Sequence, residues 1–147
     1  MKVILMVGVP GSGKSTLAKE YAEKYSAEIL SSDKIREELF GSEEPQEKNW
    51  LIFKILYERG RKFLDEGKNI IIDSTNVDRK TRKTVFRNFQ DYTYEKVAVV
   101  KNIDIKEAKK RNRNRDRFVP EEVIEKFQEK FQMPTLEEFD EVIIDTN

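Results

Sequence analysis

Short apolar runs alternate along the chain with longer segments in which apolar residues recur at helical spacing. The runs that predict strands lie at residues 3–7, 27–32, 69–73, 94–100 and 139–144. The first and third runs are almost continuously apolar, which is typical of strands buried on both faces of a parallel sheet. The pattern therefore predicts an α/β fold with a five-stranded parallel sheet and helices on both of its faces.

The segments with helical spacing lie at residues 15–25, 34–40, 46–66 and 78–89, and two more begin at Asp104 and Pro120. Asp33 is expected to be the N-cap of the second helix, because its carboxylate can accept a hydrogen bond from the first turn. In the long third helix, Gly60 is expected to interrupt the helix and Gly67 to end it. Trp50 falls among the apolar residues of this helix and is expected in the core.

The length of 147 residues fits a single domain that spans residues 1–147. There are 28 acidic and 28 basic residues, so the net charge gives no information about partners, and no protein partner is identified. The absence of cysteine excludes disulfides and thiol nucleophiles, and the absence of histidine leaves carboxylates, lysines or water as general bases. No signal peptide or membrane-length apolar run is recognisable, so we expect a cytoplasmic protein without membrane association.

Residues 8–16, with the sequence Gly-Val-Pro-Gly-Ser-Gly-Lys-Ser-Thr, fit the phosphate-binding pattern of Gly, four residues and Gly-Lys-Ser/Thr. The loop lies between a predicted strand and a predicted helix, an order that places a helix N-terminus against an anion. Lys14 can reach the β- and γ-phosphates of ATP, and the Ser15 hydroxyl can bind Mg²⁺. The residues expected to bind the nucleotide are Gly11, Ser12, Gly13, Lys14, Ser15 and Thr16.

Two residues after the second predicted strand are candidates for the acceptor side of the site. Ligands of parallel α/β sheets bind beyond the carboxyl ends of the strands, where Asp33 is expected. Asp33 can take the proton of an attacking hydroxyl, and Arg36, one helical turn later, can hold a phosphate on the acceptor. The alternative is that Asp33 is only a helix cap and Arg36 only a surface charge.

Asp73, Ser74, Thr75 and Asn76 follow the third predicted strand. Asp73 is placed to bind Mg²⁺ directly or through water, as acidic residues on a strand beside a phosphate loop do. Asn76 is a candidate for contact with the substrate or for holding the turn. Turn chemistry alone is the alternative interpretation for both residues.

Four arginines, Arg111, Arg113, Arg115 and Arg117, follow one another in a strongly basic segment. The planar guanidinium group binds phosphate in a bidentate manner, so one or two of them can close on the nucleotide from a lid that spans about residues 106–131. A spacing of two on a helix cannot direct all four to one point. The alternatives are a solvated basic face and a nonspecific nucleic-acid patch.

The chain resembles the kinase domain of the 5′-hydroxyl polynucleotide kinases, within the wider group of small P-loop kinases, over nearly its whole length. The motifs that carry the resemblance are Gly8 to Thr16, Ser32 to Arg36, Asp73 to Asn76, and Lys110 to Asn112 leading to Arg115 and Val119-Pro120. The first motif is general to P-loop proteins, whereas the ordered set is much more specific. The resemblance implies an adenylate-kinase-like P-loop NTPase fold with a short helical lid.

The resemblance also implies roles for single residues. Lys14 and Ser15 would bind the donor phosphates and Mg²⁺, and Asp33 would be the general base that activates a 5′-hydroxyl. Arg36 would contact the 3′-phosphate of the terminal nucleotide, and Arg115 would be the catalytic lid arginine, with Arg113 and Arg117 close by. No 3′-phosphatase or ligase activity is expected of this chain.

The hypothesis from the sequence is therefore a kinase that moves the γ-phosphoryl group of ATP onto a hydroxyl, with the 5′-hydroxyl of DNA or RNA favoured as the acceptor. A kinase of the same fold that acts on a small molecule or a charged tRNA is the first alternative. The second is a nucleotide-binding module with weak ATPase activity, and the third is a nucleic-acid binder that uses residues 106–117. Arg111 and residues 146–147 are candidates for the adenine pocket.

Overall fold

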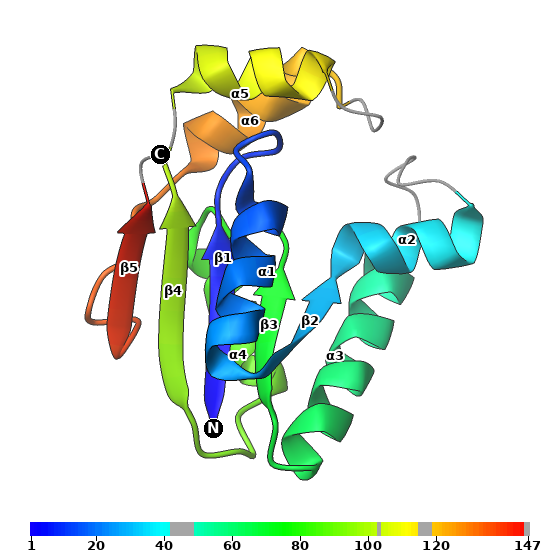
Figure 1. The fold of residues 1–147 in the computed structure, drawn as a ribbon, viewed down its shortest axis with the longest axis vertical. Helices are drawn as coiled ribbons and strands as arrows, with labels where there is room; N and C mark the ends of the chain where they lie inside the picture. Colours follow the sequence, from blue (N-terminus) through cyan, green and yellow to red (C-terminus); the bar gives the residue numbers. More distant parts are fainter. Residues whose placement is uncertain (42–48, 103, 115–118, 146–147) are drawn as a thin grey trace.

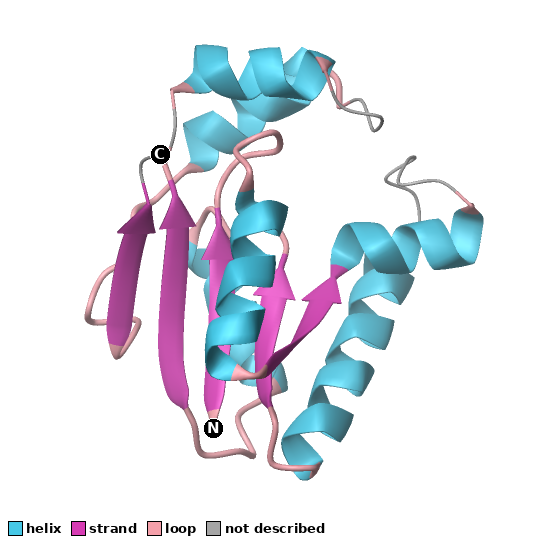
Figure 2. Ribbon diagram, in the orientation of Figure 1, coloured by secondary structure: helices cyan, strands magenta, loops and turns pink. Residues whose placement is uncertain are grey.

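The computed structural model describes residues 1–41, 49–102, 104–114 and 119–145. Within these ranges the chain forms one sheet of five strands, all of them parallel (Figure 1; Figure 2). The strands are β1 (Lys2–Val7), β2 (Ala27–Ser31), β3 (Asn69–Asp73), β4 (Glu95–Lys101) and β5 (Glu141–Asp145). Their order across the sheet is β2-β3-β1-β4-β5. The predicted five-stranded parallel sheet is thus confirmed.

Helices cover both faces of this sheet, as the sequence predicts (Figure 1). The described residues form α1 (Lys14–Tyr25), α2 (Ser32–Phe40), α3 (Asn49–Asp65), α4 (Arg79–Asn88), α5 (Ile105–Arg113) and α6 (Glu121–Lys130). In this part of the chain, no helix has both the length and the apolar composition needed to cross a membrane.

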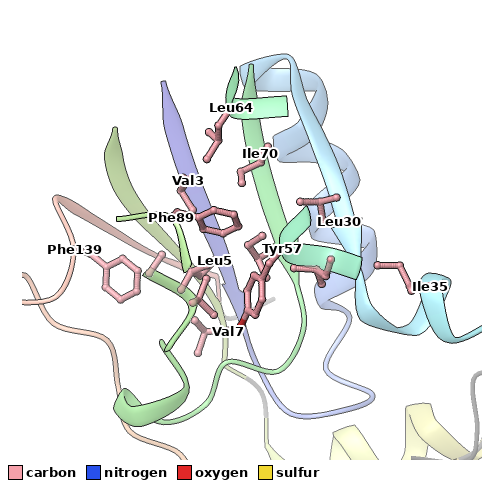
Figure 3. Close-up of a cluster of buried hydrophobic side chains, with 14 of the residues drawn as sticks. Val3, Leu5, Val7, Leu30, Ile35, Tyr57, Leu64, Ile70, Phe89 and Phe139 are labelled. Carbon is pink, nitrogen blue, oxygen red and sulfur yellow. The ribbon is translucent and has the colours of Figure 1, made fainter. Parts of the chain in front are cut away.

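Alternate residues of β1 face the two helical layers. Val3, Leu5 and Val7 belong to the cluster that packs against α3 and α4, part of which Figure 3 shows. Ile4 and Met6 point to the opposite face and pack with α1. Because all five residues are fully buried, this central strand is covered on both sides, and the phosphate loop that follows it starts from a fixed position.

Gly60 serves close packing within α3. The helix runs through Gly60 without a break, so the predicted interruption there is wrong. A Cβ atom on Gly60 would lie 2.8 Å from Cζ of Phe89. The Phe89 ring also meets the Tyr57 ring edge to face, with 5.7 Å between the ring centroids. Gly67 follows the end of α3 with φ +76°, as predicted for a helix-ending glycine.

Trp50 lies in the first turn of α3 and is 69% exposed, so the predicted core position is wrong. Seven residues later, on the same face of the helix, Tyr57 is 9% exposed. The first turn of α3 lies at the carboxyl ends of the strands, beneath α2, where the sheet ends (Figure 1). The helical period predicted the face of Trp50 correctly, but the sheet does not extend far enough to cover it.

The last two helices pack on each other above the carboxyl ends of the strands (Figure 1). Ala108 of α5 and Ile124 of α6 form one buried cluster with Val119 and with Val9 of the phosphate loop. The described part of the predicted lid segment therefore packs on the loop after β1 through apolar contacts and covers the carboxyl ends of the strands.

Candidate active site

The phosphate loop connects β1 to α1 at the centre of the sheet. Gly11 and Gly13 have φ angles of +84° and +94°, a region that residues with a side chain rarely adopt. A Cβ on Gly11 would also lie 2.5 Å from the carbonyl oxygen of Ala108. The Gly8 N–H donates to the carbonyl oxygen of Thr75 at 3.1 Å, which ties the loop to the end of β3. The loop is thus fixed in the shape that a phosphate group requires.

A pocket of about 230 Å³ opens on this loop at the N-terminus of α1. Its lining consists of Gly11, Gly13, Lys14, Ser15, Thr16 and Arg111. Lys14 is the first residue of α1, so it belongs to the same helix end as the N–H groups of the first turn, which have no partner within the helix. Positive charge from both sources favours an anion here, which fits the predicted nucleotide phosphates.

Ser15 and Asp73 lie together although 58 positions separate them in the sequence. The Ser15 hydroxyl donates a hydrogen bond of 2.9 Å to Oδ2 of Asp73, which is the last residue of β3. Hydroxyl and carboxylate oxygens are suitable ligands for Mg²⁺, which takes few protein ligands and completes its shell with water and phosphate oxygens. No group of three acidic residues suited to a metal occurs among the described residues. The pair fits a magnesium ion shared with a bound nucleotide.

Asp33 lies in the first turn of α2 and does not cap that helix, so the capping prediction is wrong. Ser31 is the N-cap, because its side chain accepts a hydrogen bond of 3.3 Å from the N–H of Lys34. Ser31 pairs with Asp73 across the sheet, so β2 and β3 end level with each other. Asp33, two residues after the end of β2, therefore lies at the rim of the sheet that holds Asp73.

Arg36 is 3% exposed, which excludes the interpretation of this residue as a surface charge. Its Nη1 donates to Oδ1 of Asp33 at 3.0 Å, and its Nη2 donates to Oδ1 of Asn49 at 2.7 Å. The guanidinium thus joins α2 to the start of α3 and holds one oxygen of Asp33. Arg36 also lines the adjoining pocket, so its predicted contact with an acceptor phosphate stays a prediction.

A second pocket of about 220 Å³ lies between the phosphate loop, α2, the start of α3, and α6. Lys14, Asp33 and Asp73 line its polar end, together with Arg36. The remaining lining residues are Pro10, Ser32, Asn49, Phe53, Ser74, Thr75, Thr81, Val119, Val123 and Phe127. Of the residues that line the two pockets, Lys14 is shared, so this second space adjoins the place where the end of a bound phosphate chain is expected.

Asp33 and Asp73 also line a space of about 380 Å³ on the side of α1, along β2 and α2. This space includes Ser15 but lacks Lys14 among its lining residues. The pocket beneath α6 is lined by Lys14 as well as by Asp33 and Asp73, so it is the candidate acceptor pocket.

Arg111 is the member of the arginine run that the structure places on the phosphate loop. Its Nη1 donates to the carbonyl oxygen of Ser12 at 3.1 Å, and its Nε donates to Oε1 of Glu107. Arg113 instead pairs with Glu121 at the surface. The predicted lid arginine Arg115 lies outside the described residues, as do Arg117 and residues 146–147.

Asn76 is 1% exposed and holds the turn after β3, one of the two roles proposed from the sequence. Its Nδ2 donates to the backbone carbonyl oxygens of Met6, Ile72 and Ser74. Its φ of +47° is in the left-handed region, where asparagine is better tolerated than most residues. Asn76 is not among the residues that line the pocket beneath α6, and its predicted contact with the substrate stays a prediction.

The buried side chain of Arg82 supports the same turn, a role that was not predicted from the sequence. Its Nη1 donates to the carbonyl oxygen of Asn76 at 2.9 Å, and its Nε and Nη2 donate to the two carboxylate oxygens of Glu138. The only signal in the sequence was an arginine at a position of α4 that faces inward.

Asn112 is fully buried and holds Val119 in the wall of the acceptor pocket. Its side-chain amide donates to the Val119 carbonyl oxygen, and its Oδ1 accepts a hydrogen bond of 3.0 Å from the Val119 N–H. Asn112 belongs to the motif that carried the family resemblance, but its function there was not evident without the structure. Phe53, Val123 and Phe127 form the apolar side of this pocket.

Comparison with known proteins gives three kinds of match. The model of a protein family described as an AAA domain (AAA_33) matches residues 3–134. The L-seryl-tRNA(Sec) kinase of Methanococcus maripaludis is 27% identical over 143 residues, which cover 90% of this chain and 53% of that protein. The chain thus spans about half the length of this curated relative.

Two solved structures illustrate the structural similarity. A protein from Chloroflexus aurantiacus has a TM-score of 0.79 at 16% identity, over 97% of this chain and 86% of that one. A chain of the Pnkp1/Rnl/Hen1 RNA repair complex has a TM-score of 0.75 at 25% identity, over 89% of this chain and 46% of that one.

Proposed function

The chain belongs to the AAA domain family AAA_33 and has the fold of P-loop kinases, and on this basis we propose that it transfers the γ-phosphoryl group of ATP to a hydroxyl group. The favoured acceptor is the 5′-hydroxyl of DNA or RNA. The observation that carries the proposal is the pair of adjoining pockets that share Lys14. A kinase requires such a pair, because donor and acceptor must meet at one phosphorus atom.

The donor would lie with its phosphates on the loop from Gly8 to Lys14, against the N-terminus of α1. Lys14 would bind the oxygens of the transferred group from its position between the pockets. Ser15 and Asp73 would hold Mg²⁺, which neutralises charge that develops on the phosphates. Arg111, fixed to the carbonyl oxygen of Ser12, would add positive charge at the rim, and we propose Arg115 as the lid arginine.

The acceptor hydroxyl would lie in the second pocket, within reach of Asp33. Its oxygen forms a bond to the γ-phosphorus while the bond from that phosphorus to the β,γ-bridging oxygen breaks, and ADP leaves. The hydroxyl proton passes to the Asp33 carboxylate as the new bond forms. Arg36 positions this carboxylate through its 3.0 Å hydrogen bond. The side chains contribute mainly position and charge, which are the principal requirements of phosphoryl transfer.

The ordered motif set and the similarity to a chain of an RNA repair complex support a nucleic-acid 5′-end as the acceptor. The apolar wall of the pocket, which includes Phe53 and Phe127, suits a nucleoside better than a fully hydroxylated sugar. Arg36 does not by itself favour one of these acceptors over another. Its hydrogen bond to Asp33 would serve a kinase with any acceptor.

A charged tRNA is the second candidate acceptor, and the 27% identity to an L-seryl-tRNA(Sec) kinase favours it. In that case the second pocket would receive the aminoacyl end of the tRNA, and Asp33 would take the proton of its side-chain hydroxyl. The two acceptors make the same demands on Lys14, Ser15 and Asp73, so they must be separated by experiment.

The test is transfer of label from γ-labelled ATP to 5′-hydroxyl DNA, 5′-hydroxyl RNA, seryl-tRNA and a panel of small sugars, assayed side by side. We expect label at the 5′-end of an oligonucleotide, and loss of transfer by roughly 100- to 10,000-fold in Asp33→Asn while ATP affinity is retained. Asp91→Asn, which removes an exposed carboxylate from the turn before β4, serves as the matched control.

Label on seryl-tRNA alone would replace the proposed acceptor by the second candidate. Label on a sugar alone would exclude both nucleic-acid acceptors. Normal transfer by Asp33→Asn would show that this carboxylate is not the base, whichever acceptor is labelled.

A further inference from the structure

Trp50 is the one tryptophan of the sequence, and it lies exposed beside the acceptor pocket. Its neighbour Asn49 lines that pocket and accepts the hydrogen bond from Arg36. Phe53, one helical turn after Trp50, lines the pocket as well. The first turn of α3 therefore presents residues inside the pocket and a large aromatic side chain outside it.

The direction of Trp50 follows from the helix on which it lies. Residues seven apart share a face of a helix, and Tyr57 of this face is buried against Phe89. Trp50 thus lies on the side of α3 that carries Tyr57, in the first turn of the helix. That turn lies at the carboxyl ends of the strands, beneath α2 (Figure 1). An exposed indole on this face, at the edge of a pocket, is available to a molecule that extends out of that pocket.

We propose that Trp50 is a stacking platform for the second nucleobase of a nucleic-acid acceptor. The inference rests on the proposed function, because it requires an acceptor hydroxyl beside Asp33. The pocket of about 220 Å³ has room for one terminal nucleoside, so the next nucleotide would lie outside the pocket. The exposed side chain of Trp50 is available to the base of that second nucleotide. Every nucleobase has an aromatic face, so this contact is tolerant of sequence.

The inference also separates classes of acceptor. A small hydroxylated molecule would fit within the pocket and would end before Trp50. A single-stranded nucleic-acid end would extend across the indole. Removal of a base-stacking aromatic side chain lowers affinity by about 5- to 150-fold per base, so the effect is large enough to measure.

The first measurement is Trp50 fluorescence, which reports one site because the chain contains no other tryptophan. The full chain is titrated with a 5′-hydroxyl tetranucleotide and, in parallel, with a nucleoside 3′-phosphate. We expect the tetranucleotide to change the emission and to protect the indole from acrylamide quenching. The nucleoside 3′-phosphate should occupy the pocket and leave the quenching constant unchanged.

The second measurement is the KM for each acceptor in Trp50→Leu, Trp50→Phe and the control Leu136→Ala. Leu136 is another exposed apolar residue, in the segment between α6 and β5. We expect Trp50→Leu to raise the KM for the tetranucleotide about 5- to 150-fold and to leave kcat and the KM for the nucleoside 3′-phosphate unchanged. Trp50→Phe should restore part of the loss, because a ring remains, and Leu136→Ala should match the wild type.

If the wild type labels oligonucleotides but Trp50→Leu keeps the wild-type KM and the emission does not respond, the stacking role is wrong and the proposed function stands. If no nucleic acid is labelled, the proposed acceptor is wrong. If, in addition, the tetranucleotide does not change the Trp50 emission, the stacking role is wrong as well. An emission change with seryl-tRNA and none with the tetranucleotide would also overturn the assignment to a 5′-end.

Discussion

The Ser15 hydroxyl donates a 2.9 Å hydrogen bond to Oδ2 of Asp73, which joins the start of α1 to the end of β3. This contact brings together two oxygen groups that the sequence analysis assigned separately to Mg²⁺. It also defines the side of the phosphate loop on which the metal would lie, because both groups flank Lys14.

Asp73→Asn should therefore lower kcat by about 100-fold and raise the Mg²⁺ concentration at half-maximal rate, because the amide is a poorer ligand than the carboxylate. The measurement is the Mg²⁺ dependence of transfer at saturating ATP. The exposed carboxylate of Asp91 provides the control, and Asp91→Asn should follow the wild-type curve. An unchanged Mg²⁺ dependence in Asp73→Asn would remove this residue from the metal site.

Arg36→Met should lower kcat while the affinity for ATP stays close to that of the wild type, because Arg36 fixes Asp33 and Asn49 and does not line the phosphate pocket. We expect a loss of about 10- to 100-fold, with partial recovery in Arg36→Lys, which keeps the charge but not the planar fork. ATP binding by calorimetry and transfer rates on the same preparations provide the comparison. If kcat falls equally in Arg36→Met and Arg36→Lys, the planar geometry of the guanidinium is essential and a positive charge alone is insufficient.

Gly60→Ala should lower the free energy of unfolding by about 1–3 kcal/mol, because the new methyl group would lie 2.8 Å from a ring atom of Phe89. The intrinsic preference of alanine for helices opposes this effect by only about 1 kcal/mol. Denaturant unfolding followed by circular dichroism measures the difference.

Gly41→Ala adds the same methyl group in open space at φ +69°, so it isolates the cost of a left-handed backbone, about 1–2 kcal/mol. A Gly60→Ala protein as stable as the wild type would mean that Phe89 can move aside.

Stability at alkaline pH should depend on Tyr57, because burial raises the pKa of this phenol from 10.0 to about 12. Between these values the unfolded chain loses the phenolic proton first, so the free energy of unfolding falls as the pH rises from 10 to 12. The loss attributable to this group is about 2–3 kcal/mol at the upper limit.

Tyr57→Phe cannot ionise and should therefore lose less stability than the wild type over that pH range. Denaturant unfolding of both proteins at pH 8 and at pH 11 gives the required difference. If the free energy of unfolding falls equally with pH in the two proteins, the raised pKa does not belong to Tyr57. A smaller fall in Tyr57→Phe confirms the assignment.

The five strands and their parallel direction could be predicted from the sequence because apolar runs and a phosphate loop are local patterns. Continuous burial of Val3 to Val7 and of Ile70 to Ile72 requires long apolar runs, and the chain contains them. The helix after β2 shows where local reasoning fails. Ser31 and Asp33 are both good caps, and the choice between them depends on where β2 stops, which its pairing with β3 determines.

Contacts between elements account for the other differences. The helical period of α3 predicts that Trp50 lies on the same face as Tyr57, but no local pattern in the sequence indicates where the sheet ends. Trp50 is therefore exposed although its position in the period predicted burial. Likewise, the partners of Arg36 and Asn112 depend on how helices pack, and Asn76 shows the same dependence because its amide reaches back to Met6 of β1. Residue type alone indicated that polar residues gather at the carboxyl ends of the strands. The packing of helices and strands determines which of these residues line a pocket and which form hydrogen bonds that support the turns.

The two pockets that meet at Lys14 have consequences for the order of events during turnover. In the proposed reaction each substrate would occupy its own pocket, so neither must depart before the other arrives. The phosphoryl group then has no need to form a covalent intermediate with the protein. For the proposed reaction, double-reciprocal plots of rate against one substrate at several levels of the other should intersect, and the configuration at a chiral γ-phosphorus should invert.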